Sequence, residues 1–141
     1  MRASILYLSI ENWRRDIEMK VITLGEILLR LSTEEDVRLK STKEFRVCYG
    51  GAEANVGISL VHFGHNVSVA TVLPQDNPLN DAVSSRLRMN GINTDLVATE
   101  YGRLGTYFLE QGNAVRASRV TYDRLYSSIS VLNELCWNLD E

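Results

Sequence analysis

Short apolar runs alternate along the chain with polar and glycine-containing segments. Residues 21–24 form a β-rich apolar run that meets Gly25, and residues 27–31 continue largely apolar. This pattern predicts a buried strand that runs into a second extended piece. Residues 45–49 alternate in the manner of a half-buried strand, and the pair Gly50-Gly51 ends it.

A helix and a strand are predicted next. Residues 52–63 have the length of a helix and carry apolar side chains on several sides, so we expect this helix to be deeply packed. Gly64 suits its carboxyl end, and residues 67–73 resume strand character up to Pro74.

A second helix follows a capping pattern. Asn77-Pro78 resembles an N-cap followed by a proline in the first turn, and Asn90-Gly91 suits the end of the helix. Between them, Leu79, Val83 and Leu87 recur at intervals of four. This spacing predicts one amphipathic helix.

The remaining segments complete an α/β pattern. Residues 95–99, 105–110 and 118–123 are short extended candidates separated by glycine-containing turns. Alternating strands and helices predict a partly parallel sheet flanked by helices. Residues 1–18 lead into no recognisable strand, so we interpret them as an amino-terminal extension or an ordinary terminal helix, with the fold proper in residues 19–141.

Composition and charge point to a small-molecule partner. With 45% hydrophobic and 23% charged residues, the 141-residue chain matches an ordinary globular protein. Its net charge of −3 gives no basic footprint for nucleic acid. The apolar run at residues 5–10 is too short to cross a membrane. Cys48 and Cys136 lack metal-ligand spacing, which indicates reduced thiols in a cytoplasmic protein.

The most informative stretch is Gly50-Gly-Ala-Glu-Ala-Asn55. Two glycines directly before a helix let a ligand approach the backbone and leave unpaired amide hydrogens at the helix start. Asn55 falls about one turn after Gly51, so its side chain offers a donor and an acceptor to a hydroxylated ligand. A simple tight turn is the alternative when this stretch is considered alone.

A second polar cluster spans residues 105–110 and 118–124. Because alternate residues of a strand share a face, Tyr122 and Arg124 project together. A guanidinium beside phenolic hydroxyls suits a carboxylate, although a solvated arginine beside packed tyrosines is the alternative. Glu26, which follows the first strand, is either an acceptor for sugar hydroxyls or a solvated turn residue.

The sequence contains no complete nucleotide-binding motif. It has neither a Gly-x-x-x-x-Gly-Lys-Ser/Thr loop nor a Gly-x-Gly-x-x-Gly after a strand. His62 and His65 stand three residues apart, but no carboxylate or cysteine accompanies them, so we expect no metal site.

Four segments, in order, resemble the ribokinase (PfkB) family of sugar kinases. Residues 20–31, KVITLGEILLRL, are similar to the opening strand of that family, and residues 50–56, GGAEANV, to its sugar-binding signature. Residues 104–110, LGTYFLE, and 119–124, RVTYDR, more specifically resemble the 2-keto-3-deoxygluconate kinase branch.

The resemblance implies a sugar-acid site formed by the helix start and by a small β lid, and this lid tends to form a homodimer interface in the family. The implied substrate-binding residues are Gly51, Ala52, Glu53, Ala54, Asn55, Tyr107, Tyr122 and Arg124. Leu125-Tyr126 depart from the branch, which usually has smaller residues there, commonly including glycine.

Members of the family are more than twice as long as this chain. Their carboxyl-terminal half, missing here, supplies the Gly-Ala-Gly-Asp motif, the aspartate base and the adenine site. The resemblance implies ATP and magnesium as cofactors of the full-length kinases, with neither binding this chain alone and no catalytic residue within it. We expect the amino-terminal, sugar-binding portion of an ATP-dependent 2-keto-3-deoxygluconate kinase. The alternatives are a fructokinase- or ribokinase-type fragment and a non-catalytic remnant.

Overall fold

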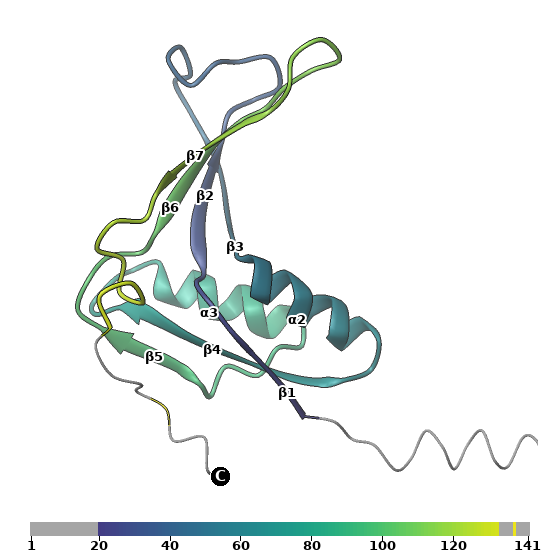
Figure 1. Ribbon diagram of the computed structural model, residues 1–141, viewed down its shortest axis with the longest axis vertical. Coiled ribbons are helices and arrows are strands. Elements are labelled where there is room, and N and C mark those ends of the chain that lie inside the picture. The colour runs from purple at the N-terminus through teal and green to yellow at the C-terminus, as the bar shows by residue number, and fades with distance from the viewer. Residues whose placement is uncertain (1–19, 133–136, 138–141) are drawn as a thin grey trace, which may run out of the picture.

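The computed structural model describes residues 20–132 and Trp137. These residues form an α/β body, from which a small β-sheet rises (Figure 1). The predicted α/β class, with a parallel sheet, flanking helices and separate small strands, is confirmed. The predicted extension at residues 1–18 lies outside the described residues.

The body contains a parallel sheet covered by two helices. Its strands lie in the order β1 (Lys20–Leu24), β4 (Asn66–Pro74) and β5 (Val97–Glu100). Parallel neighbours require crossover connections. Here α2 (Ala52–His62) precedes β4, and α3 (Asn80–Met89) joins β4 to β5.

The core of the body lies between β4 and the two helices. Val67, Val69 and Leu73 of β4 are almost fully buried, and they belong to one cluster with Val83 and other helix residues. Alternation along β4 directs this apolar set toward the helices. The body therefore has a packed layer that can hold the start of α2 in place.

The small sheet has four strands in the order β3, β2, β6, β7. Their bounds are β2 (Leu28–Ser32), β3 (Arg46–Gly50), β6 (Thr106–Glu110) and β7 (Arg119–Asp123). β2 and β6 are parallel, while both outer pairs are antiparallel. Because β3 leads directly into α2, the sheet and the helix start meet at one place (Figure 1).

Both helices end near the predicted glycines. Gly64 and Gly91 have φ angles of 88° and 77°, the left-handed conformation that favours glycine after a helix. The predicted N-cap at Asn77 is wrong, because Leu79 occupies the N-cap position of α3 and the Asn77 side chain accepts a hydrogen bond from the Leu79 amide, at 2.9 Å, in the turn before the helix. The regular helix begins three residues later, at Asn80.

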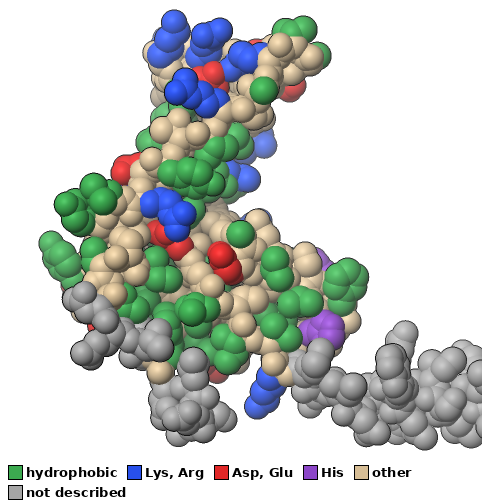
Figure 2. All heavy atoms as spheres, in the orientation of Figure 1, with side chains coloured by type: hydrophobic (Ala, Val, Ile, Leu, Met, Phe, Trp, Pro, Cys, Tyr) green, Lys and Arg blue, Asp and Glu red, His purple; other side chains and the backbone are tan. Residues whose placement is uncertain are grey.

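The predicted burial of the first strand and of the first helix is wrong. Ile22 is 52% exposed on β1, and on α2 only Ala54 and Gly57 are buried, while Phe63 is 80% exposed. Among the described strands β1 pairs only with β4, and α2 packs on β1 and β4 with one side. Figure 2 shows hydrophobic side chains spread over the visible face of the body.

In the described part of the chain, no helix combines the length and apolar character needed to cross a membrane.

Candidate functional site

The start of α2 presents backbone groups rather than a side-chain cap. Gly51 occupies the N-cap position in an extended conformation, and no side chain caps the helix there. The first helical hydrogen bond runs from the Asn55 amide to the Gly51 carbonyl oxygen at 2.9 Å. A helix leaves the amides before that bond without partners inside the helix, so they can serve a ligand.

Glycine at position 51 is required by a close backbone approach. A Cβ atom built there would collide with the carbonyl oxygen of Glu26. Gly105 is similarly pressed against the Glu26 carboxylate. These two glycines let β1, β6 and the helix start converge around Glu26.

One row of side chains crosses all four strands of the small sheet. In register, Cys48 of β3 lies opposite Arg30 of β2, Arg30 lies opposite Tyr107 of β6, and Tyr107 lies opposite Tyr122 of β7. Residues directly opposite one another share a face of the sheet. The Tyr107 and Tyr122 rings lie 5.6 Å apart between centroids. We call these four residues the cross-strand row.

Two cavities adjoin where the cross-strand row meets α2. The first, the sheet cavity, has a volume of about 280 Å³. It is lined by Leu28, Arg30, Cys48, Tyr49, Gly50, Gly51, Ala52, Asn55, Arg86, Tyr107 and Tyr122. The second, the Glu26 cavity, has a volume of about 400 Å³. It is lined by Gly25, Glu26, Leu28, Gly51, Ala52, Glu53, Tyr122, Arg124 and Ile129.

Most of the residues predicted to bind substrate line these two cavities. Gly51, Ala52 and Tyr122 line both of them, whereas Asn55 and Tyr107 line only the sheet cavity. Glu53 and Arg124 line only the Glu26 cavity. Ala54 lies apart from this group: it is 2% exposed, packs in the core of the body, and lines a separate cavity of about 20 Å³.

Arg124 is held by a buried carboxylate. Its Nε and Nη2 atoms lie 2.7 and 2.6 Å from Oε2 of Glu26, whose side chain is only 7% exposed. The Arg124 guanidinium also lies 5.8 Å from the centre of the Tyr122 ring. Glu26 is therefore a buried ion-pair partner and not the solvated turn residue considered as one alternative from the sequence, while its expected role as an acceptor for sugar hydroxyls stays a prediction. Its Oε1 atom is buried and has no hydrogen-bond partner among the described residues.

Arg30 was not found by the sequence interpretation. The neighbouring Cys48 side chain, together with Tyr107, raises the pKa of Arg30 and outweighs the lowering effect of burial. The Arg30 Nε atom is buried and has no hydrogen-bond partner within the described residues. The sequence does contain a signal for this residue, because Arg30 interrupts the otherwise apolar run of residues 27–31. Its position beside Tyr107 follows only once the pairing of β2 with β6 is known.

The carboxyl-terminal end of β7 is fixed by a second ion pair. Arg103 donates two hydrogen bonds to Asp123, at 2.8 and 2.7 Å. These hydrogen bonds lower the pKa of the Asp123 carboxyl below its usual value. Asp123 directly precedes Arg124, so this ion pair helps to hold the end of β7, which carries Tyr122 and leads into Arg124.

The departure at Leu125-Tyr126 has a local structural consequence. Tyr126 has a φ angle of 59°, a left-handed conformation that is uncommon for residues other than glycine. Both side chains are largely exposed, so packing does not explain the conformation. The turn has a geometry suited to glycine, although a tyrosine occupies it.

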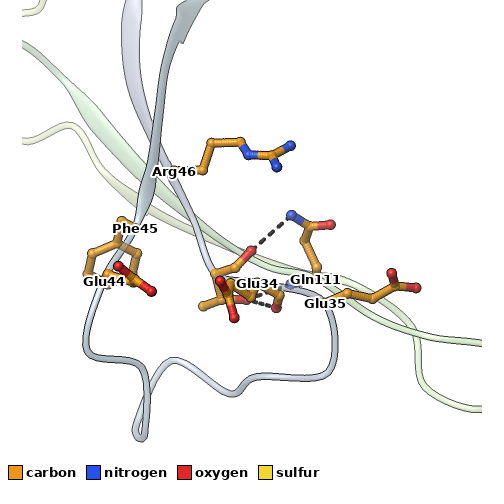
Figure 3. A pocket seen from close by; sticks show the side chains of 7 residues that line it. Glu34, Glu35, Glu44, Phe45, Arg46 and Gln111 are labelled. Carbon is orange, nitrogen blue, oxygen red and sulfur yellow. Dashed lines mark hydrogen bonds between the residues drawn. The ribbon is translucent and has the colours of Figure 1, made fainter.

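A further cavity of about 750 Å³ lies at the distal end of the small sheet (Figure 3). Gln111 closes one side by hydrogen bonding to the Thr33 carbonyl oxygen at 2.9 Å. Glu35 and Glu44 are exposed and lie on opposite sides of the view in Figure 3. This cavity is lined mostly by exposed side chains, and none of the predicted site residues lines it.

Within residues 20–132 and Trp137, no group of three or more His, Cys, Asp or Glu side chains is arranged to hold a metal ion. Cys48 is a free thiol. The other predicted thiol, Cys136, lies outside the described residues.

The α/β body and the small sheet together form cavities lined by tyrosines, arginines and an asparagine. Such a lining suits a polar small molecule. Residues 19–132 match the sequence model of the pfkB family of carbohydrate kinases. The chain belongs to this family.

The chain is similar to two solved structures and to one further relative. It is 49% identical to 2-dehydro-3-deoxygluconokinase from Thermotoga maritima, with a TM-score of 0.75 over 81% of this chain and 35% of that one. It is 40% identical to a PfkB family carbohydrate kinase from Listeria grayi, with a TM-score of 0.79 over 85% and 37% of the two chains. It is 32% identical to 2-dehydro-3-deoxygalactonokinase from Haloferax volcanii over 79% of this chain and 35% of the relative. The chain thus spans about a third of the length of these proteins.

Proposed function

We propose that this chain is the sugar-binding portion of an ATP-dependent kinase that phosphorylates 2-keto-3-deoxygluconate. The observation that carries the proposal is the arrangement of two adjoining cavities around the start of α2, lined by seven of the eight predicted residues. The names of the Thermotoga maritima and Haloferax volcanii relatives support a 2-keto-3-deoxy sugar acid as the substrate class.

The lining groups suit a hydroxylated acid. The Asn55 amide and the amides at the start of α2 offer hydrogen bonds to sugar oxygens. The hydroxyls of Tyr107 and Tyr122 add donors and acceptors, and Arg124 supplies a guanidinium held in place by Glu26. Such groups fix the orientation of the acceptor molecule without reacting with it.

Phosphoryl transfer requires more than acceptor binding. ATP would supply the phosphoryl group, and rate acceleration depends on charge stabilisation that strengthens in the transition state. The described residues contain no cluster of acidic, histidine or cysteine side chains suited to magnesium, so we assign neither a metal site nor a catalytic step to them. We expect no sugar phosphorylation by residues 1–141 alone.

A non-catalytic binding protein is the second candidate, because the side chains that line the two cavities can hold a ligand without reacting with it. A fructokinase- or ribokinase-type substrate is the alternative within the enzyme class. We further propose a cytoplasmic location, as suits a free thiol at Cys48, and a homodimer formed through the small sheet, whose edge strand β7 is exposed along its whole length.

A chimera tests the proposal directly. Residues 19–132 would replace the matching part of the Thermotoga maritima enzyme, and ATP-dependent phosphorylation of 2-keto-3-deoxygluconate and fructose would be compared. We expect turnover of the acid in preference to fructose. A folded chimera that prefers fructose, or that turns over neither sugar, would remove this substrate assignment.

Point variants in the chimera locate the site. Tyr107→Phe removes a hydroxyl from the cavity and should weaken binding of the acid by about 1 kcal/mol, which is roughly fivefold. Tyr101→Phe is the matched control, because Tyr101 is 83% exposed and lines neither cavity. Equal effects of the two substitutions would place the sugar elsewhere.

A further inference from the structure

The two adjoining cavities differ in charge. The Glu26 cavity is lined by two glutamates and one arginine, and that arginine is already paired with Glu26. The sheet cavity is lined by two arginines, Arg30 and Arg86, and by no acidic residue. Among the described residues neither of these arginines forms an ion pair. The sheet cavity is therefore the cationic end of the combined space.

Arg30 is the better placed of the two cations. It lies in the centre of the cross-strand row, flanked in register by Cys48 and Tyr107, whereas Arg86 is exposed on α3. Its Nε atom is buried and has no hydrogen-bond partner within the described residues, which leaves a donor unsatisfied in the absence of a ligand. Arg30 is half-buried and lines the sheet cavity, and a guanidinium next to a phenol suits an anion.

Arg124 is less suited to be the main receptor for a negative charge. Two of its nitrogen atoms are directed at Glu26 Oε2, so the pair is neutral overall and part of the donor fork is occupied. An incoming carboxylate would also approach the charge of Glu26, which is unfavourable. Arg124 is therefore better suited to donate hydrogen bonds to uncharged oxygens.

We propose that Arg30 determines specificity for acids by binding the carboxylate of the substrate in the sheet cavity, with the hydroxyl-bearing end directed toward the Glu26 cavity. This inference rests on the proposed function for its substrate class. The anion-binding role of Arg30 itself depends only on the charge and burial of the cavity.

Cys48 offers a local readout of this charge, because it lines the sheet cavity directly opposite Arg30. In the full chain carrying Cys136→Ser, Cys48 is the sole thiol. Iodoacetate is an anion and iodoacetamide is neutral, yet both alkylate the thiolate. The ratio of their rates therefore reports local attraction of an anion and is independent of how much of the thiol is ionised.

We expect Arg30→Gln to lower the iodoacetate-to-iodoacetamide rate ratio about two- to fivefold, as for loss of a charge at a partly exposed site. Arg30→Lys should retain most of the ratio. Arg119→Gln, the same change at an exposed position on β7, should leave it unaltered. Circular dichroism spectra establish that each variant is folded. An unchanged ratio in folded Arg30→Gln would overturn the proposal.

Protection by ligands separates this inference from the proposed function. 2-Keto-3-deoxygluconate should slow alkylation of Cys48 in the chain that retains Arg30. The same sugar acid should slow alkylation much less in Arg30→Gln, and fructose should protect Cys48 weakly in both chains. A ratio that depends on Arg30 without protection by the sugar acid would support the anion site and remove the substrate. Equal protection with and without Arg30 would contradict a role for Arg30 in binding the carboxylate.

Discussion

The small sheet and the α/β body use their surfaces in opposite ways. The small sheet places polar and aromatic side chains of the cross-strand row against the start of α2, and these groups line the two cavities. The body buries β4 under two helices but leaves Ile22 of β1 and Phe63, which directly follows α2, exposed. The small sheet thus lines cavities whose groups suit a polar ligand, whereas the body leaves apolar side chains exposed.

The exposed apolar surface of the body lies beside elements that have few neighbours among the described residues. The chain spans about a third of the length of its relatives, and among the described strands one edge of β1 has no neighbour and the outer side of α2 is exposed. Exposed apolar surface also promotes association. The proposed acceptor site and the exposed apolar surface of the body are therefore formed by different side chains.

The contrast between buried and exposed apolar side chains of the body can be tested with two substitutions to alanine. Leu73→Ala should lower the free energy of unfolding by about 2–5 kcal/mol, because Leu73 is 1% exposed in the core. Phe63→Ala should change it by less than about 0.5 kcal/mol, because that ring is mostly in solvent. Urea unfolding measures both, and light scattering should show less self-association for Phe63→Ala. A large loss of stability in Phe63→Ala would mean that the outer side of α2 is packed.

The junction of sheet and body depends on the pair of Glu26 and Arg124. Arg124→Ala leaves a buried carboxylate without its partner and should destabilise the chain by about 1–3 kcal/mol. Adding Glu26→Gln should recover part of this loss, because the uncompensated charge is then removed. Chemical unfolding of the single and double variants forms a double-mutant cycle. Strictly additive losses would show that the pair does not couple the two regions.

A smaller effect is expected at the exposed pair of Arg103 and Asp123 on the small sheet. Hydrogen bonding to Arg103 lowers the pKa of Asp123 in the folded state. The ion pair therefore contributes to stability at every pH above the ordinary carboxyl pKa of about 3.9, including neutral pH. It is lost as pH falls through the lowered pKa. Melting temperatures should therefore fall less steeply with acidification in Asp123→Asn, and the two curves should converge at low pH. Parallel curves would contradict the interaction.

Local sequence patterns predicted where the strands and helices lie better than they predicted how deeply these elements are buried. Alternation in residues 45–49 and the glycines at 64 and 91 placed strands and helix ends correctly, because these depend on nearby residues. Burial of β1 and α2 was overestimated, because an apolar side chain is buried only when another element covers it. The sequence alone cannot show whether that element is present.

The site was only partly predictable for a related reason. Gly51 and Asn55 stand close together in the sequence, so their placement at one helix start followed from local rules. The partnership of Glu26 with Arg124 joins residues 98 positions apart, and Arg30 meets Tyr107 only through the pairing of β2 with β6. Such long-range register is a property of the folded sheet, and no single segment encodes it.

A titration followed by nuclear magnetic resonance tests the central claim most directly. The ¹⁵N-labelled full chain would be titrated with 2-keto-3-deoxygluconate while its backbone amide signals are recorded. We predict saturable shifts at Gly51, Asn55, Tyr107 and Tyr122, with little change at Val69 and Val83 in the core of the body. Shifts confined to the distal cavity around Gln111, or no saturable shift at all, would contradict a sugar-acid site between the small sheet and α2.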